Sequence, residues 1–277
     1  MQLRERLAAL YPASSHRTLK RWLLTGRVSV DGQVVRRGDL ALSGGERVEL
    51  AAFAAPEFPD LLRLVHEDDE LIVVDKPPGL LTIATEHERE RTAYRLLFDY
   101  VVRGAGSRDG LRVFVVHRLD RETSGLVVFA KSARAKRALQ AQFERRAVER
   151  VYVAIVEGRV SAPSGTLRSR LRQGPSLNVR PTRDPRAGKE AITHYRVLER
   201  RSATTVLELR LMTGRRGQIR AQLAALGHPV VGDVAYGSRR RALGRVCLHA
   251  TRLGFEHPRG GRASFESPPP ATFRQVR

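Results

Sequence analysis

The feature that most constrains the fold is a succession of short apolar segments, rich in Val, Ile and Leu, between residues 61 and 212. Short β-branched runs between turn signals are typical of strands. Few helical patterns separate them, and strands that follow one another without crossover helices build antiparallel sheet. The sequence therefore predicts an α+β fold on a mixed, mainly antiparallel sheet, with strands at 62–65, 71–74, 113–116, 126–130, 151–156, 192–198 and 205–212.

Two helices are expected within this region. The first spans 132–145, begins at a serine cap and repeats apolar residues every fourth position at Ala135, Leu139 and Phe143. The second spans 218–226 and lines one face with Ile219, Leu223 and Leu226.

The N-terminal segment has the pattern of a separate small domain. A helix is expected over 16–24, with one cationic side formed by Arg17, Lys20 and Arg21. Asp31-Gly32 favours a tight hairpin between short valine strands, and another strand follows at 48–50. Residues 51–60, rich in Ala and Pro, are interpreted as a linker. The predicted domains are 1–50 and 61–277.

The charge balance indicates a polyanionic partner. The chain carries 50 basic and 29 acidic residues, a formal net charge of +21, and arginine dominates the basic set. Arginine suits bidentate phosphate contacts and stacking on bases, although codon usage with a solvated surface is the alternative explanation. The segment 158–188 predicts a long basic hairpin or loop in which Arg168, Arg170 and Arg172 bind RNA, and 267–277 predicts an extended strip.

The number of cysteines and the hydropathy pattern indicate the cellular compartment. Cys247 is the single cysteine, which excludes a disulfide framework and is typical of a reducing compartment. Residues 1–10 lack the pattern of a secretory signal, and no apolar run reaches membrane-spanning length. We expect a cytoplasmic protein.

The segment 116–131 is the strongest candidate for an active site. His117, Arg118, Asp120, Thr123 and Ser124 lie between two apolar strands, where a rigid sheet holds an exposed loop. A His117–Asp120–Ser124 triad is disfavoured by the short separation of its members. From local sequence alone, a polar turn capped by Asp120 and Thr123 is as good an interpretation as a catalytic loop.

The stretch His117-Arg-Leu-Asp120-Arg-Glu-Thr-Ser-Gly125 resembles the signature of the RluA family of RNA pseudouridine synthases. Three further segments resemble family motifs in the same order: Val73–Leu80, with its Lys-Pro-x-Gly turn; Tyr152–Gly158; and Thr213–Arg220 together with Gly227–Asp233. The resemblance covers nearly the whole chain.

The resemblance implies roles for individual residues. Asp120 would be the catalytic carboxylate, Arg220 its ion-pair partner and Tyr152 the ring that stacks on the target base. Arg118 would fill the space left by an extruded base, and Leu248 and Thr123 would contact substrate. No cofactor or metal is implied. His117 is interpreted as structural, and Lys76 as a residue of the turn that also contacts RNA.

The third motif departs from the family pattern. The family usually has a histidine just before Gln-Ile-Arg and another soon after it. This chain has Arg216-Gly217 before that tripeptide and Gln222 after it. The departure puts the local packing and the choice of RNA in doubt.

The N-terminal unit resembles the small α-L RNA-binding domain of the ribosomal small-subunit protein four type, on Thr18–Trp22, Gly26–Gly32 and Gly44–Val48. Together the resemblances imply conversion of uridine to pseudouridine in structured RNA, with large-subunit ribosomal RNA expected and transfer RNA as the alternative. A non-catalytic RNA-binding or ribosome-assembly protein on the same scaffold is the competing class. Neither a membrane nor an obligate protein partner is expected.

Overall fold

A computed structural model describes residues 1–24, 26–51, 57–104, 112–174 and 179–277. The chain divides into two compact units, one formed by Met1–Pro59 with Leu97–Arg112 and the other by Asp60–Leu96 with Val113–Arg277. The predicted N-terminal domain falls in the first unit, which also takes in 97–112. Half of the predicted linker, 52–56, lies outside the described residues.

The smaller unit contains the predicted helix, hairpin and strand. Its elements within Met1–Pro59 are α1 (Leu3–Leu10), α2 (His16–Leu24), β1 (Val28–Val30), β2 (Gln33–Val34) and β3 (Val48–Leu50), with the strands in the order β2-β1-β3. Asp31 and Gly32 both have positive φ, 50° and 80°, as a two-residue hairpin turn requires. Leu3 and Leu7 of α1 pack with Leu19 and Trp22 of α2 in a core of this unit's own.

The larger unit is built on an eleven-stranded sheet, in which the main path runs β10-β9-β11-β12-β8-β13-β7-β5-β4, with β14 on β13 and β6 on β7. Of the pairings between these described strands, β7 with β13 is parallel and the others are antiparallel. The expected α+β fold on mainly antiparallel sheet is confirmed. The strands are β4 (Arg63–Glu67), β5 (Leu71–Lys76), β6 (Phe114–Val115), β7 (Ser124–Ala130), β8 (Glu149–Glu157), β9 (Ser164–Gln173), β10 (Val179–Thr182), β11 (Lys189–Arg200), β12 (Thr204–Leu211), β13 (Leu248–Glu256) and β14 (Arg262–Glu266).

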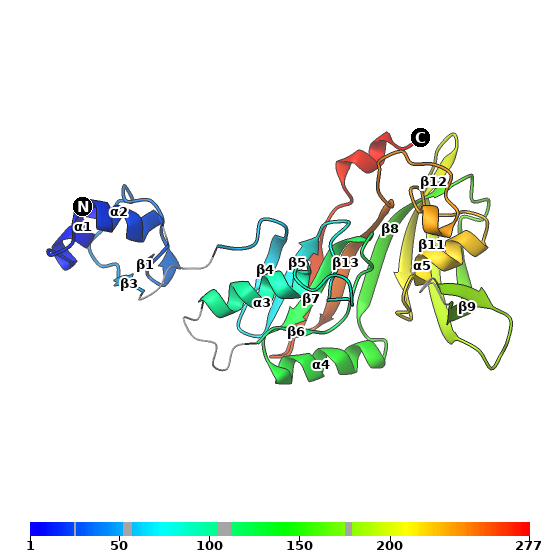
Figure 1. Cartoon of the computed structure of the whole chain (residues 1–277), viewed down its shortest axis with the longest axis horizontal. Helices are drawn as coiled ribbons and strands as arrows, with labels where there is room; N and C mark the ends of the chain where they lie inside the picture. The colour runs from blue at the N-terminus through cyan, green and yellow to red at the C-terminus, as the bar shows by residue number, and fades with distance from the viewer. Residues whose placement is uncertain (25, 52–56, 105–111, 175–178) are drawn as a thin grey trace. The chain divides into compact units, whose positions relative to one another are not determined.

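Both predicted helices of this region form. In α4 (Ala133–Glu144), Ser132 is the N-cap and accepts from the Ala135 amide at 3.0 Å. This helix packs on β6, β7 and β13, whereas α5 (Gln218–Ala225) packs on β9 and β10 (Figure 1). In the basic segment 158–188, β9 and β10 pair antiparallel, as the predicted hairpin requires, and residues 175–178 lie outside the described residues.

Several elements were not predicted from the sequence. These are α1, α3 (Ala93–Gly104), β13 and β14. The tail is also not a fully extended strip, because Ala271–Gln275 forms a 3-10 helix, η2. That turn buries Phe273 and Val276, whose carbonyl groups accept from Arg201 at 2.8 and 2.5 Å. In the described part of the chain, no helix has the length and apolar character needed to cross a membrane.

The parallel contact between β7 and β13 brings distant segments together at the centre of the sheet (Figure 1). Gly125, at φ 113°, pairs with Ala250, and a side chain at residue 125 would overlap the Ala250 carbonyl oxygen. Glycine is therefore required there. The pairing sets the loop that precedes β7, which carries Asp120, beside the start of β13.

Candidate active site

The loop that carries Asp120 is fixed on both sides of that residue. On one side, the Leu119 amide donates to Thr82 Oγ1 at 3.2 Å, and the same hydroxyl donates to the Leu119 carbonyl at 2.9 Å. On the other side, the Gly79 amide donates to the Arg121 carbonyl at 2.8 Å. Because both neighbours are anchored to the Lys-Pro-x-Gly turn region, the carboxylate is presented from a rigid backbone.

Lys76 holds the same turn from within. Its ammonium group donates to the carbonyls of Pro77 and Leu80, both at 2.8 Å, and of Arg121 at 3.3 Å. Burial lowers the pKa of Lys76 to about 7. The predicted role in the turn is confirmed, but the expected RNA contact is wrong, because the side chain is fully buried.

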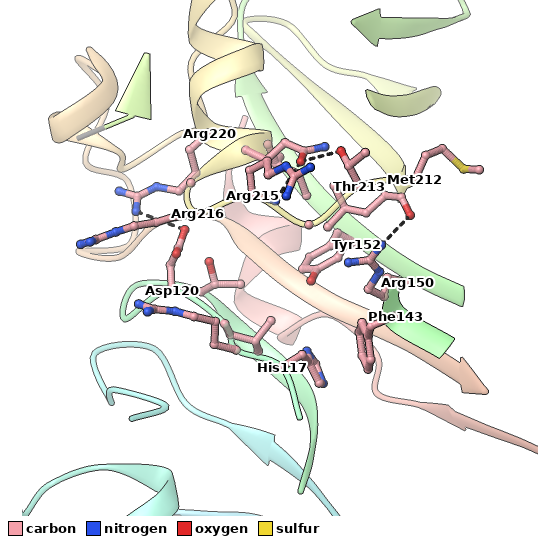
Figure 2. Close-up of a pocket in the computed structure, with 18 of the residues that line it drawn as sticks. His117, Asp120, Phe143, Arg150, Tyr152, Met212, Thr213, Arg215, Arg216 and Arg220 are labelled. Atoms are coloured by element: carbon pink, nitrogen blue, oxygen red, sulfur yellow. Dashed lines mark hydrogen bonds and ion pairs between the residues drawn. The ribbon is translucent and has the colours of Figure 1, made fainter. Parts of the chain in front are cut away.

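A cavity of about 450 Å³ opens above this loop. All six residues assigned to catalysis or substrate contact line it: Arg118, Asp120, Thr123, Tyr152, Arg220 and Leu248. Arg118, Asp120 and Thr123 come from the loop before β7, and the other three come from β8, α5 and β13. Figure 2 shows Asp120, Tyr152 and Arg220 grouped around one space. The sheet thus gathers residues that are up to 130 positions apart in sequence.

Arg220 lies between two carboxylates. Its Nη1 is 3.7 Å from Asp120 Oδ2, whereas its Nε and Nη2 donate to Asp233 at 2.6 and 2.7 Å. Its guanidinium also lies over the Tyr236 ring, 4.8 Å from the centroid. Burial alone would lower the pKa of Arg220, but the hydrogen bonds and charge of Asp233 raise it above its ordinary value. Asp233 therefore orients a permanent positive charge that faces Asp120 across a longer gap.

Tyr152 provides a flat wall of the cavity. It is 7% exposed, lies on β8 and pairs with Ala250 of β13, and Leu248 lies two residues before Ala250 on β13. Burial raises the pKa of Tyr152 to about 12. The phenol therefore stays protonated at neutral pH and can donate a hydrogen bond while its ring offers a stacking surface.

His117 is structural, as expected. Its ring stacks on Phe143 with centroids 4.8 Å apart, and its Nε2 accepts from the Val128 amide at 3.2 Å. Burial, and then the charge of Arg150, lower the pKa of His117 to about 3, so the ring is neutral. The Ser124 hydroxyl bonds His249 Nδ1 at 2.8 Å instead. A His117–Asp120–Ser124 triad is therefore wrong.

The unusual third motif is accommodated by packing. Gly217 caps α5 in the left-handed region at φ 57°, and a Cβ there would lie 2.6 Å from the Tyr236 hydroxyl. Gln222, near which the resemblance implies a histidine, is buried and donates to the Leu167 and Ala191 carbonyls at 3.1 Å. These bonds tie α5 to β9 and β11. Arg216 is exposed and lines the cavity.

The predicted RNA-binding arginines outside the cavity have different surroundings. Arg17, Lys20 and Arg21 are exposed on α2. On β9, Arg168 is paired with Glu190 at 2.8 Å, Arg172 is exposed, and Arg170 donates to the carbonyls of Ala187 and Gly188 at 3.0 and 2.8 Å. Arg170 is thus engaged in holding the hairpin.

Two residues of the site received no role from the sequence. Asp233 was noted only as part of the third motif, and its partnership with Arg220 has no local periodic signal. Arg150 was not singled out, yet it stands two positions before Tyr152 on β8, and alternate residues of a strand share a face. Both residues line or support the cavity.

Comparison with known proteins decides the family. A family model described as RNA pseudouridylate synthase matches residues 70–225. This chain belongs to that family. Its enzymes are isomerases that convert uridine in RNA to pseudouridine, and the resemblance inferred from the Asp120 motif is confirmed.

Curated relatives match almost the full length. The ribosomal large subunit pseudouridine synthase D of Pseudomonas aeruginosa is 37% identical, over 96% of this chain and 88% of that protein. The protein of the same name from Vibrio cholerae is 35% identical, over 97% and 88%. Among solved structures, human RNA pseudouridylate synthase domain containing 1 is 25% identical, with a TM-score of 0.62, over 76% of this chain and 84% of that one.

Proposed function

We propose that this pseudouridine synthase acts on a uridine of large-subunit ribosomal RNA, with Asp120 as the catalytic carboxylate. The observation that carries the assignment of Asp120 is its position in the cavity, 3.7 Å from the Arg220 guanidinium and on the same cavity as the Tyr152 ring. The names of the relatives support the ribosomal target.

The proposed chemistry is an isomerisation in which no atom is gained or lost. Asp120 attacks the ribose or takes a proton from it, and the bond between N1 of the base and C1′ breaks. The base turns and C5 bonds to C1′, and at this point Asp120 leaves the ribose or returns the proton that it took. The proton on C5 is then lost, and N1 carries a proton in the product. Both forms of the first step use the Asp120 carboxylate, and the Arg220 guanidinium is the cation that faces it, 3.7 Å away. Tyr152 offers the surface on which the base turns.

The target base must leave its stack to reach Asp120. Arg118 supports this step, because it is exposed, lines the cavity and stands two residues before Asp120. A planar guanidinium can stack in the space that the base vacates. We therefore assign Arg118 to the RNA and Thr123 and Leu248, both 2% exposed, to the wall against the nucleoside.

Residues 1–50 are proposed to be an α-L RNA-binding domain, with α2 as its RNA-facing helix. The exposed basic side chains of α2 and the separate core of this unit support the proposal. The corresponding division is 1–50 for this domain, 51–60 for a linker and 61–277 for the catalytic domain. A ribosomal substrate and a single, buried cysteine are in keeping with a cytoplasmic location.

The test is pseudouridine-specific chemical mapping of total RNA from cells with and without this gene, complemented by wild-type protein or by the Asp120→Asn variant. Loss of one modified position in large-subunit ribosomal RNA, restored only by the wild type, is the expected result. Loss confined to transfer RNA would overturn the ribosomal target. An unchanged map would favour a non-catalytic RNA-binding or assembly role.

A further inference from the structure

Arg150 is a buried arginine in the wall of the active-site cavity without a counter-ion. It is 8% exposed, and among the described residues it forms no ion pair. Its Nε has no hydrogen-bond acceptor, and its Nη2 makes only a long bond of 3.4 Å to the Leu211 carbonyl. A buried guanidinium in this state is costly for a folded protein.

The surroundings hold the side chain without neutralising it. The guanidinium lies over the Phe143 ring, 5.5 Å from the centroid, and burial lowers the pKa of Arg150. Figure 2 shows Arg150 beside Tyr152, with Asp120 on the other side of that ring. Gly214 leaves room for the Arg150 guanidinium, because a Cβ at residue 214 would lie 2.5 Å from Arg150 Nη1. The site is therefore shaped around a free guanidinium.

We propose that Arg150 binds a phosphate group of the RNA strand that enters the cavity, next to the nucleotide stacked on Tyr152. The inference rests on the proposed function, since the substrate supplies the missing negative charge. A phosphate matches the planar guanidinium with two acceptors and a full charge. A uracil carbonyl, which is neutral, would leave the buried charge unbalanced. The weak bond to Leu211 allows the group to turn and present Nε with a terminal nitrogen.

The consequence is measurable through salt. Each phosphate contact that a cation makes with single-stranded nucleic acid adds about 0.7 to the slope of log affinity against log salt. Arg150→Met, which keeps the length and the packing on Phe143, should bind substrate RNA several-fold more weakly and reduce the slope by about 0.7. Arg150→Lys, which keeps the charge, should retain the wild-type slope.

The matched control is Arg196→Met. Arg196 is an exposed arginine of β11, paired with Glu208 at 3.0 Å, and it does not line the cavity. The Arg196→Met substitution removes the same charge from the chain and should leave the slope of log affinity against log salt unchanged. Melting temperatures without RNA check folding, and Arg150→Met is expected to melt no lower than the wild type, because it relieves an unpaired buried charge.

The experiment measures RNA affinity over a salt series for all four proteins, with pseudouridine formation by the wild type recorded on the same RNA. A wild-type slope in Arg150→Met would overturn the proposal, even if affinity fell, since the contact would then be to a neutral group. An equal loss of slope in Arg196→Met would also overturn it. Absence of wild-type turnover would instead contradict the proposed function.

Discussion

Replacing Asp120 by asparagine keeps the size of the side chain and removes its charge. The proposed role of the carboxylate is in the chemistry and not in docking. Asp120→Asn should therefore form no detectable pseudouridine while its RNA affinity stays within a few-fold of the wild type. Single-turnover assays and equilibrium binding on the same transcript check both halves. Measurable turnover by the purified variant would refute the assignment of Asp120.

Arg220 forms ion pairs with two carboxylates, so its replacement should lower both the catalytic rate and the stability of the fold. Arg220→Met removes the cation that faces Asp120 and leaves Asp233, 1% exposed, without either hydrogen bond. We expect kcat to fall by about 10²-fold or more, and stability by about 3–5 kcal/mol. Steady-state kinetics and urea unfolding measure the two effects.

Asp233→Asn provides the matched comparison. It preserves one hydrogen bond to Arg220 and leaves the charge opposite Asp120 in place, so it should lower stability while reducing kcat less than Arg220→Met does. Near-normal turnover in Arg220→Met would show that another arginine partners Asp120. A larger kcat loss in Asp233→Asn would make Asp233, and not Arg220, the dominant residue.

At the residue scale, the sequence predicts those positions that lie in long, contiguous motifs. Asp120, Tyr152 and Arg220 were assigned in this way, and the structure places all three on one cavity. The role of Asp233 depends on a side-chain contact across 13 positions that only the fold creates. Arg150 was missed because a basic residue at the start of a strand ordinarily faces solvent, whereas here it is buried.

At the scale of elements, β9 offers a graded test of the basic hairpin. Arg172 is exposed, Arg168 is partly neutralised by Glu190, and Arg170 bonds backbone carbonyls. Arg172→Gln should therefore reduce the salt slope of RNA binding by about 0.7–0.9, and Arg168→Gln by less. Arg170→Gln should instead lower the free energy of unfolding, by no more than about 1.5–3 kcal/mol for each of its two hydrogen bonds that is lost.

The measurement is affinity over a salt series for substrate RNA and for a scrambled RNA, together with thermal unfolding. Phosphate contacts carry no sequence information, so both RNAs should lose affinity almost equally. Identical slopes for wild type and Arg172→Gln would show that this face of β9 meets only solvent. The positive charge of the hairpin would then reflect codon usage and a solvated surface, and not RNA binding.

The predictability of elements followed their apolar patterns. The strands of 61–212 other than β9 and β10 were recognised because short apolar runs lie between turns. The segment of β9 and β10 is basic and poor in apolar residues, so it was predicted only as a hairpin or loop. In contrast, β13 contains His249, Thr251 and Arg252, polar residues that mask a central strand. The helix α1 is eight residues long and has its leucines at 3, 7 and 10, so its pattern covers only two turns and is too short to identify. The end of the tail forms the 3-10 helix η2, which brings Phe273 and Val276 to buried positions.

For the whole molecule, the proposed two-domain arrangement predicts a division of labour between anchoring and chemistry. Changing Arg17, Lys20 and Arg21 of α2 to glutamine removes exposed charge. On long ribosomal transcripts the Michaelis constant should rise, while kcat at saturation stays unchanged because the cavity is untouched. Steady-state kinetics on a long transcript measure the effect.

A short stem-loop that contains only the target uridine is the internal control, because it offers α2 no distant RNA to hold. The triple variant should process it like the wild type. An equal rise of the Michaelis constant on both substrates would mean that these residues act on the target loop itself. No rise on either would leave the first fifty residues without a part in RNA binding.

The place of β13 in the sheet has a consequence for how the protein is made. This strand begins at Leu248, yet it lies between β7 and β8, which are complete by residue 157. During synthesis, the earlier strands leave the ribosome with their future neighbour still untranslated, and exposed strand edges invite wrong pairing. Asp120 and Tyr152 come into register only when β13 is inserted. We therefore expect the nascent chain to be inactive until its last tenth has emerged, so that any action on RNA waits until synthesis is nearly finished.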